Sequence, residues 1–200
     1  MKILTLKEEE HYLQRSSQPR KDVAVVMIGT GMRPEEVLKL QGGNINLAKR
    51  KIFISRGKTE AARRSVPITS VEAVEVLRAR LALHKDGYLF PPEPKFGLKS
   101  NTPHLTTVTK AHNRAVKRAG ITGPFVLYDL RHTFATRSLD AGIDLATVSK
   151  ILGHSKIQVT MRYVHVLERH KEEAGRKMWA WREEEKKRTL QTVAEVIVRR

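Results

Sequence analysis

The last third of the chain holds three residue types that together suit one chemistry. Arg131, His154 and Tyr163 lie in stretches that read as helices and tight turns. A tyrosine phenol can attack a phosphodiester, but its ordinary pKa of about 10 means that it needs a base or nearby cations to ionise. Arginine binds two phosphate oxygens with its planar fork, and histidine can bond the phosphate or carry a proton. Each residue alone more often has a structural role, but the set predicts phosphodiester cleavage by a tyrosine.

Two further basic residues upstream can join this set. Arg33 stands between Gly31 and Pro34, in a predicted turn between helices where a side chain is aimed rather than packed. Lys58 is at the tip of a predicted polar hairpin loop that also holds Arg56. A lysine carries a transferable proton for the leaving 5′-oxygen, and a second arginine can share the charge of the transition state.

The charge of the chain points to a polyanionic partner. The sequence has 38 Lys and Arg against 21 Asp and Glu, a formal net charge of +17, with a pI near 10.4. Nucleic acid is the default partner, although charge alone also allows a ribosomal-type protein or a merely basic domain. Hydrophobic residues make up 40% of the sequence, enough for the core of one domain, or of one domain with an extension.

Several kinds of protein are disfavoured by what the sequence lacks. It has no cysteine, so it forms neither a disulfide framework nor a thiolate zinc site. It offers no clustered carboxylates for a metal, and arginines can replace a metal at a phosphate, so we expect no metal and no cofactor. No apolar run is long enough to span a bilayer and no signal peptide is evident, so we expect a cytoplasmic, DNA-associated protein without membrane contact.

Hydrophobic periodicity predicts an α+β, mainly α-helical domain with a small antiparallel β-sheet. Apolar spacing, caps and glycine stops indicate the helices, and alternation indicates the strands. The apolar run 22–28 is predicted to end at Gly29 and Gly31. The predicted helices are 4–13, 22–28, 34–40, 71–84, a basic helix that ends at Gly120, 129–141, 145–152 and 159–173, and the predicted strands are 44–47, 51–55 and 64–68.

A basic stripe is predicted on the helix that ends at Gly120. No acidic residue occurs from Pro94 through Tyr128, and four basic residues recur at helical spacing on one face. A solvated helix face usually mixes both signs of charge, so we favour contact with DNA phosphates over simple solvation. The basic stripe consists of Lys110, Arg114, Lys117 and Arg118.

Four stretches of the chain together resemble one known family, the tyrosine recombinases, also called phage integrases. The stretches are 30–40, 129–136, 152–155 and 160–165, and with the hairpin lysine they occur in the order typical of the family. The resemblance covers most of the chain and implies a tyrosine-recombinase-like catalytic domain. It implies Arg33 and Arg131 as phosphate clamps, Glu36 as the buried acid that supports the first arginine, Lys58 as the general acid, His154 as the later histidine, and Tyr163 as the nucleophile.

One position departs from the family pattern. The family usually has histidine three residues before the second arginine, and here that position is Tyr128. A phenol can donate a hydrogen bond to phosphate, but it is a poor base at neutral pH. Removal of the Tyr163 proton is therefore expected to rest on another group or on water, and Tyr128 is a rival phenol near the site.

The resemblance also implies a domain organisation. Residues 1–175 are expected to form the catalytic domain and residues 176–200 a charged helical tail with an apolar stripe. The N-terminal core-binding domain of the family is expected to be absent, because the resemblance to the catalytic domain begins almost at Met1. The sequence is then either a fragment or a short member, and DNA binding without that domain is expected to be weak and salt-sensitive. The tail is predicted to dock on a neighbouring protomer, with packing on its own domain as the alternative. The docking residues are Leu190, Val193 and Ile197.

The implied activity is site-specific recombination of double-stranded DNA. Cleavage leaves a 3′-phosphotyrosine and a free 5′-hydroxyl, which attacks a partner strand. We expect a homotetramer on DNA and a monomer or weak oligomer without it, in a prokaryotic cytoplasm or encoded by a phage. Two alternatives remain open: a type IB topoisomerase-like nicking and closing enzyme, and a DNA-binding protein whose site has decayed.

Overall fold

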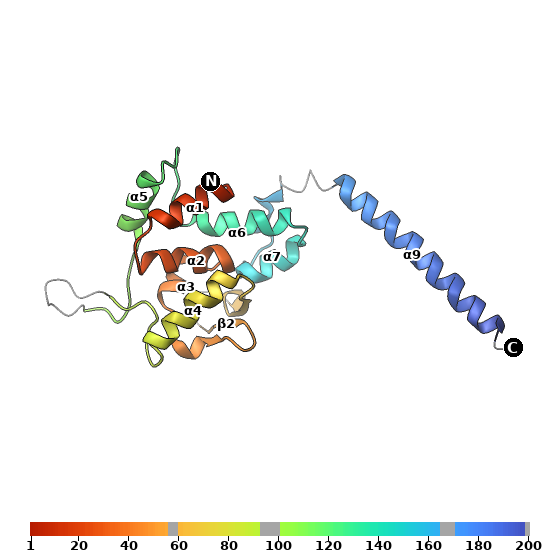
Figure 1. Ribbon diagram of the computed structural model, residues 1–200, viewed down its shortest axis with the longest axis horizontal. Coiled ribbons are helices and arrows are strands. Elements are labelled where there is room, and N and C mark those ends of the chain that lie inside the picture. Colours follow the sequence, from red (N-terminus) through yellow and green to blue (C-terminus); the bar gives the residue numbers. More distant parts are fainter. Residues whose placement is uncertain (56–59, 93–100, 165–170, 199–200) are drawn as a thin grey trace.

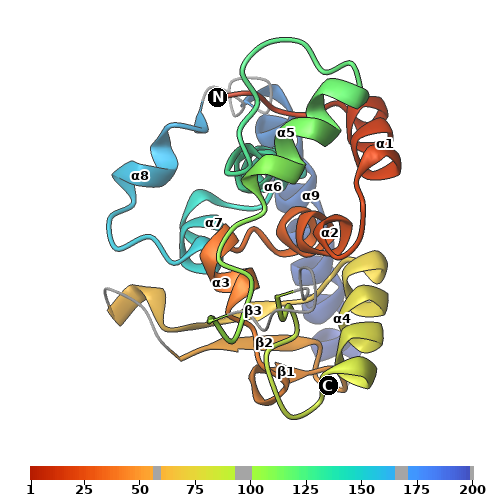
Figure 2. The same cartoon turned by 90° about the vertical axis from the view of Figure 1, so that its left-hand side faces the viewer.

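Helices make up most of the fold, and a small sheet lies at one end of it (Figures 1 and 2). The arrangement comes from a computed structural model that describes residues 1–55, 60–92, 101–164 and 171–198. The predicted α+β, mainly helical class is confirmed. The helices are α1 Leu6–Arg15, α2 Arg20–Thr30, α3 Pro34–Leu38, α4 Val71–Leu83, α5 Thr109–Arg118, α6 Asp129–Asp140, α7 Leu145–Leu152, α8 Gln158–Met161 and α9 Lys171–Val198, with 3-10 turns η1 Gly42–Asn44 and η2 Glu60–Ala62.

The sheet is antiparallel, in the order β1-β2-β3, and it shows the predicted alternation. Ile52 pairs with Val66 and Ile54 pairs with Arg64, and the three apolar side chains are buried. Because alternate residues of a strand point to the same side, Arg64 shares the inner face with Val66. The sheet thus directs one arginine into the interior. Its strands are β1 Ile45–Asn46, β2 Lys51–Ile54 and β3 Arg64–Pro67.

α2 lies at the centre of the helical part, packed against α4 and α6. Its residues from Asp22 to Met27 are buried, as the apolar run predicts. Of the two predicted stops, Gly31 is confirmed, whereas Gly29 lies inside the helix and packs closely on the start of α4: a Cβ there would lie 2.8 Å from the Cβ of Ser70. The helix ends at Gly31, whose left-handed φ of 68° redirects the chain into the turn before α3.

A second apolar cluster joins α6, α7 and the segment that follows α8. Tyr163 is 1% exposed and packs with Ala135, Leu139, Val148 and Leu152. A ring buried among side chains of two helices has little freedom to move without disturbing their packing. The cluster therefore fixes the position of the predicted nucleophile relative to α6 and α7.

The single helix predicted over 159–173 is wrong. α8 ends at Met161, and the N–H of Tyr163 donates to the Thr160 carbonyl at 3.1 Å in a tight turn. Thr160 and Tyr163 are both buried, so packing against the neighbouring helices outweighs the local helical pattern. The rest of the predicted helix up to residue 170 lies outside the described residues.

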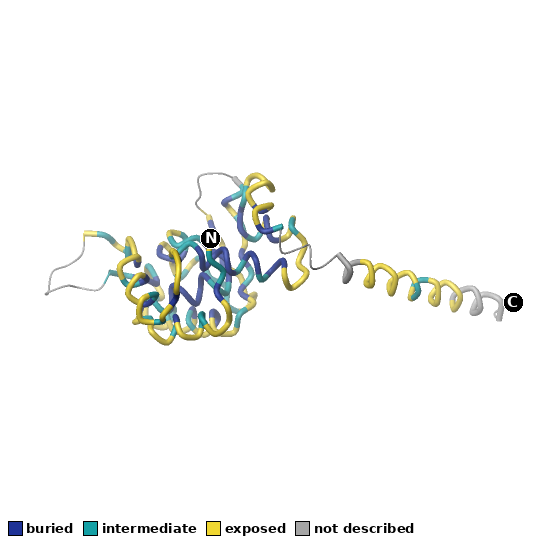
Figure 3. Tube along the Cα trace, turned by 90° about the horizontal axis from the view of Figure 1, so that it is seen from above, coloured by how far each residue is buried: buried dark blue, intermediate teal, exposed yellow. Residues whose placement is uncertain are grey.

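α9 extends away from the rest of the chain (Figures 1 and 3). It begins at Lys171, before the boundary at 176 that the sequence suggests. Its described apolar side chains do not pack on the domain. None of the described helices, α9 included, combines the length and hydropathy needed to cross a membrane. The large apolar residues of α9 that are more than half exposed are Met178, Trp179, Trp181 and Leu190.

Candidate active site

Three arginines from distant parts of the chain surround the C-terminal end of α7. Each donates a hydrogen bond to one of three consecutive carbonyl oxygens. The last carbonyls of a helix lack partners within it and carry partial negative charge, so guanidinium groups satisfy and stabilise them. The end of α7 therefore gathers positive charge at one point. The pairs are Arg64 Nε with the Ile151 oxygen (2.6 Å), Arg131 Nη2 with the Leu152 oxygen (2.8 Å) and Arg33 Nη2 with the Gly153 oxygen (3.3 Å).

Glu36, in the first turn of α3, links two of these arginines. Its carboxylate accepts from Arg33 Nη1 at 2.9 Å and from both terminal nitrogens of Arg64 at 2.9 and 3.0 Å. It also accepts from the backbone N–H of Arg33 at 2.9 Å, at the start of α3. Burial alone would raise the pKa of Glu36, but Arg64 and then Arg33 hold it below its ordinary value. An ionised Glu36 therefore fixes the Arg33 side chain.

Arg131 is completely buried and held by neighbouring acceptors. Nη1 donates to the Gly31 carbonyl at 2.8 Å, and Nη2 lies 2.9 Å from Nε2 of His154. Its Nε has no hydrogen-bond partner among the described residues. Burial lowers the pKa of Arg131 to about 10, with Tyr128 opposing, so the guanidinium stays charged near neutral pH.

His154 follows α7 directly and is neutral at physiological pH. Because an arginine can only donate, Nε2 of His154 must accept from Arg131, and Nδ1 then carries the proton. Nδ1 donates to the Thr160 hydroxyl at 2.7 Å, which ties α8 to the site. Burial lowers the pKa of His154 to about 4, and the charges of Arg131 and Arg33 add to that effect.

The hydroxyl of Tyr163 contacts a histidine that the sequence patterns did not single out. Its oxygen lies 2.5 Å from Nδ1 of His132, the residue directly after Arg131. Burial raises the pKa of Tyr163, while the charges of Arg131 and Arg162 oppose the rise. The phenol is therefore protonated at neutral pH and already bonded to a nitrogen base.

Tyr128 lies at the N-terminal end of α6, beside Arg131 and His132. Its ring centre lies 5.8 Å from the guanidinium carbon of Arg131 and 5.1 Å from the ring centre of His132. Burial alone would lower the pKa of Arg33, but Glu36 and Tyr128 raise it above its ordinary value. Tyr128 thus belongs to the site through its contacts with cations, whereas Tyr163 makes the hydrogen bond to His132.

The described residues at this point form a cationic centre. Arg33, Arg64 and Arg131 gather at the end of α7, the carboxylate of Glu36 binds the first two, and His154 is neutral, so the centre carries a net positive charge. Within the described part of the chain, no group of three or more His, Asp or Glu gathers as metal ligands do. A cationic centre built from arginines suits a phosphate group.

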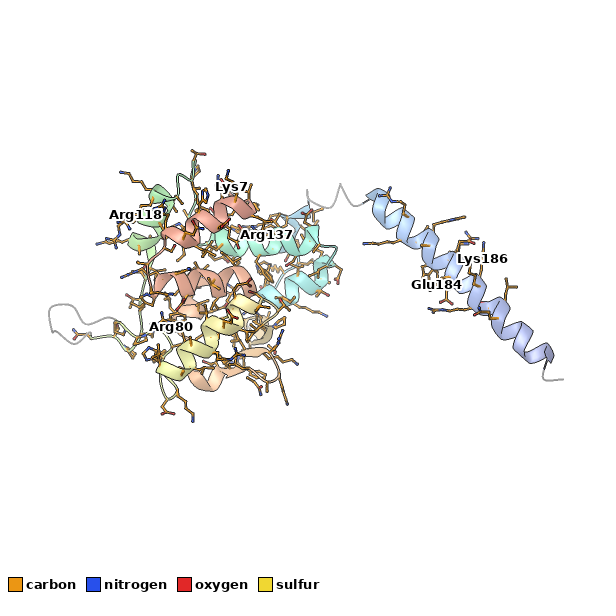
Figure 4. The ribbon with its side chains drawn as sticks, in the orientation of Figure 1. Lys7, Arg80, Arg118, Arg137, Glu184 and Lys186 are labelled. Atoms are coloured by element: carbon orange, nitrogen blue, oxygen red, sulfur yellow. The ribbon has the colours of Figure 1, made fainter. Side chains whose placement is uncertain are left out.

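The basic stripe lies on α5, away from this centre. All its members are exposed, and Arg118 projects from α5 in Figure 4. A hollow of about 420 Å³ lies between α3 and the start of α5, with Tyr128 at its border. The hollow therefore connects the helix that carries the stripe with the edge of the cationic centre. Lys58 and Arg56, the two predicted hairpin residues, lie outside the described residues.

Arg64 and His132 are site residues that sequence patterns could have revealed. Arg64 alternates with Val66 and Ile68, which are both buried, so the strand pattern already placed an arginine on an inner face. His132 lies one helical turn after Tyr128, on a helix face that points toward the site. Neither pattern predicts which residue the side chain contacts. Arg64 binds Glu36 and His132 binds Tyr163, and both partners come from other elements of the fold.

Comparison with known proteins agrees with this geometry. A model of the phage integrase family matches residues 2–170, so the chain belongs to that family. A relative named tyrosine recombinase XerC, from Oceanobacillus iheyensis, is 35% identical over 162 residues, which cover 74% of this chain and 50% of that protein. The chain spans about half the length of the curated relatives it matches. The resemblance to tyrosine recombinases is therefore confirmed at the level of family.

Solved structures show the same fold. The crystal structure of XerA recombinase matches with a TM-score of 0.68 and 26% identity, covering 91% of this chain and 64% of that one. The Tn1549 transposon integrase, solved in complex with circular intermediate DNA, matches with a TM-score of 0.64 and 25% identity, covering 81% and 62%. The described fold is that of a tyrosine recombinase catalytic domain.

Proposed function

We propose that the chain is the catalytic part of a site-specific recombinase that cuts and rejoins double-stranded DNA through Tyr163. The observation that carries the proposal is the gathering of Arg33, Arg131 and His154 at one helix end, with the hydroxyl of Tyr163 bonded to His132, the residue directly after Arg131. Family membership supports the same activity, and the Tn1549 integrase with a similar fold was solved with DNA.

The arginines suit the binding of one phosphodiester. Arg33 is partly exposed and already fixed by Glu36, so it offers a preset donor to a phosphate oxygen. Arg131 is charged and keeps an unused Nε donor within the described site. Charge that develops on the non-bridging oxygens in the transition state is stabilised most by cations fixed in advance. His154 accepts a hydrogen bond from Arg131 at Nε2 in this structure, and once Nε2 carries a hydrogen it can donate to the phosphate instead.

The proposed cleavage forms a bond between Tyr163 Oη and phosphorus and breaks the bond from phosphorus to the 5′-oxygen. We assign protonation of that oxygen to Lys58, which lies outside the described residues, because lysine carries a proton that arginine does not release. The covalent link keeps the energy of the phosphodiester, so rejoining by a 5′-hydroxyl requires no nucleotide cofactor.

DNA is proposed to run across the basic stripe and the hollow toward Tyr128. This path joins exposed positive charge on α5 to the phosphate site at the end of α7. Phosphate contacts by Lys and Arg give affinity without base specificity, so these residues position the duplex. Arg56, which lies outside the described residues, is assigned to the same kind of phosphate contact.

We also propose the domain roles suggested by the sequence. Residues up to about 170 form the catalytic domain, and α9 is an arm that docks on a neighbouring copy in a tetramer on DNA. The exposed apolar side chains of α9 support docking, because water-exposed tryptophans gain most from a partner surface. Leu190 is among them, whereas the side chains of Val193 and Ile197 lie outside the described residues.

Covalent capture tests the cleavage step directly. The protein is incubated with a library of nicked duplexes whose central sequence is randomised, denatured, and separated by size. Wild type should give a protein–DNA adduct, because the short strand beyond the nick diffuses away and traps the phosphotyrosine. Tyr163→Phe should give none, and Tyr128→Phe should retain it. An adduct that persists in Tyr163→Phe would contradict Tyr163 as the nucleophile.

The same experiment separates the alternatives. Sequencing the captured duplexes identifies a preferred site, and a plasmid with two such sites should then recombine. Relaxation of a supercoiled plasmid that lacks the site would instead indicate a topoisomerase-like enzyme. No adduct on duplexes that wild type binds would indicate a DNA-binding protein without cleavage.

A further inference from the structure

The described fold contains two buried tyrosine–histidine pairs in different surroundings. Tyr163 Oη lies 2.5 Å from Nδ1 of His132, and Tyr12 Oη lies 2.8 Å from Nδ1 of His112. Burial raises the pKa of both phenols. At Tyr163 the charges of Arg131 and Arg162 oppose this rise, whereas no arginine is among the causes that act on Tyr12. The two pairs therefore share a hydrogen bond and differ in whether cations favour loss of the proton.

The orientation of the His132 ring leaves Nδ1 as the acceptor. Nε2 faces the carboxylate of Asp129 at 4.0 Å, so the proton of the neutral ring is best placed on Nε2. The hydroxyl of Tyr163 then donates to the lone pair of Nδ1. Asp129 is itself buried, and its other carboxylate oxygen accepts from the N–H of Val126 at 3.0 Å. Asp129, His132 and Tyr163 therefore lie in that order, with an electrostatic contact at 4.0 Å between the first two and a hydrogen bond between the last two.

Charges from several elements act on His132. Burial lowers its pKa below the ordinary value, and Asp129 opposes that effect. The His132 ring is therefore neutral near neutral pH, as a proton acceptor must be. Once the ring takes up a proton, the carboxylate of Asp129 stabilises the imidazolium. The other groups that act on it are Arg131 on its own helix, Arg162 after α8 and the α-amino group of Met1, while the rings of Tyr128 and Tyr163 flank it.

We propose that His132 is the proton acceptor for Tyr163, and that Asp129 stabilises the imidazolium ion that forms. The inference deepens the proposed function, on which it rests. His132 takes the role of base that Tyr128 cannot perform, because a phenol is a poor base. The nitrogen in contact with the reacting oxygen of Tyr163 belongs to His132. His132 is then a catalytic residue, and Asp129 is a positioning residue that acts through it.

The proton and electron changes balance without a further reactant. The O–H bond of Tyr163 breaks and its proton moves to Nδ1 of His132, while the oxygen pair forms the bond to phosphorus. The bond from phosphorus to the 5′-oxygen breaks, and that oxygen takes a proton from the separate donor assigned to Lys58. On rejoining, the 5′-hydroxyl returns its proton to that donor and attacks phosphorus. The bond from phosphorus to Tyr163 Oη then breaks, and the imidazolium returns its proton to the phenol.

The central variant is His132→Asn, measured by single-turnover cleavage of a captured nicked duplex. Asparagine places an oxygen where Nδ1 was, so it can still accept the hydrogen bond of Tyr163, but it cannot take up the proton. We expect cleavage to slow by about 100-fold or more, the usual contribution of a general base, with unchanged DNA affinity. The wild-type rate should fall with acid as His132 becomes protonated, and this fall should be absent in His132→Asn.

Rescue at the nucleophile distinguishes proton transfer from a structural role. Tyr163 is replaced by a fluorinated tyrosine whose phenol ionises near neutral pH, in wild type and in His132→Asn. If His132 takes the proton, the defect of His132→Asn should largely disappear, because the phenol no longer needs a base. A defect that persists unchanged with the fluorinated residue overturns the proposal.

The pair of Tyr12 and His112 supplies a matched control within the same protein. His112→Asn makes the same change at a buried histidine bonded to a phenol, so it should lower stability. Because His112 also lines the hollow on the proposed DNA path, its cleavage is measured with saturating DNA, where the fall of the rate with acid should remain. Asp129→Asn is the second variant, and its amide oxygen can still accept from Val126. Loss of the carboxylate should lower the pKa of His132, slow cleavage less than His132→Asn does, and shift the acid fall to lower pH.

The outcomes separate this inference from the function beneath it. Wild type that forms no adduct on DNA it binds overturns both. Active wild type with equal or faster cleavage in His132→Asn overturns only the assignment of His132, and faster cleavage would show that its hydrogen bond restrains Tyr163.

Discussion

Arg64 and Glu36 form a two-point ion pair, with Nη1 2.9 Å from Oε1 and Nη2 3.0 Å from Oε2. Both side chains are at most 10% exposed, and the pair joins the first residue of β3 to the first turn of α3. Through its other bonds, Arg64 reaches the Ile151 carbonyl and Glu36 holds Arg33. The pair is therefore the brace that sets the position of a phosphate clamp.

Arg64→Lys should weaken this brace. Lysine keeps the charge but cannot make the fork to Glu36 and the bond to Ile151 together, so we expect a loss of about 2 kcal/mol in unfolding free energy. A misplaced Arg33 should also slow covalent capture by between about 10- and 100-fold. Urea unfolding and single-turnover cleavage measure the two effects.

Arg80→Lys is the control for that change. Arg80 on α4, labelled in Figure 4, bonds the partly buried Asp22 with Nε at 2.8 Å, away from the site. Arg80→Lys should lower the unfolding free energy to a similar extent as Arg64→Lys and leave the cleavage rate unchanged. Equal slowing in both variants would show that Arg64 acts through general stability alone.

The neutral state of His154 predicts a dependence of stability on pH. Its folded pKa is about 4, below the ordinary value of 6.5 that applies in the unfolded chain. The unfolded chain therefore binds more protons between these values, so stability is complete above about pH 6.5 and falls as pH drops toward 4. Denaturant unfolding should show this decline in wild type and a shallower one in His154→Gln. An imidazole NMR signal of His154 that titrates near pH 6.5 would contradict the prediction.

Gly153→Ala should displace Arg64 as well as strain the backbone. Gly153 has a left-handed φ of 68°, and a Cβ there would lie 2.8 Å from Arg64 Cδ and 2.9 Å from the Ala61 oxygen. We expect a loss of about 3 kcal/mol from backbone strain and overpacking, measured by thermal unfolding, together with slower cleavage. In Gly120→Ala, at φ 67° with nothing described within 4 Å of the added Cβ, we expect only the backbone cost of about 1 kcal/mol. Equal losses would argue against the clash.

Neutralising the basic stripe should change the salt dependence of DNA binding. In a variant with Lys110→Gln and Arg114→Gln, each lost phosphate contact should reduce the slope of log affinity against log salt by about 0.9. Arg78→Gln on α4, which lies apart from α5 in Figures 1 and 2, should leave the slope unchanged. Filter binding across a salt series measures both, and an unaltered slope in the double variant would remove α5 from the DNA path.

Shortening the chain at residue 170 should prevent assembly on DNA if α9 docks on a neighbour. Leu190→Glu should have the same effect, because it places a charge on an exposed apolar position, whereas Thr189→Glu adds the same charge beside it and should assemble normally. Sedimentation of each protein with a captured duplex gives the mass of the complex. Unchanged assembly in the shortened chain would refute docking by α9.

The sequence by itself determined the features that depend on local order. The glycine stop after Leu152, the apolar run of α2 and the alternation of β3 fix elements because helix and strand periods repeat over a few residues. The spacing of residues around Arg33, Arg131 and Tyr163 likewise identified the family, because these boxes are contiguous stretches.

Only the tertiary structure decided which side chains meet. Arg33 contacts the carbonyl of Gly153, 120 positions later, and Tyr163 contacts His132 rather than Tyr128. Such contacts depend on how α2, α6 and α7 pack, which no local period encodes. The same packing ended α8 at Met161, where the pattern continued as a helix, because burying the ring of Tyr163 outweighed the weak local preference.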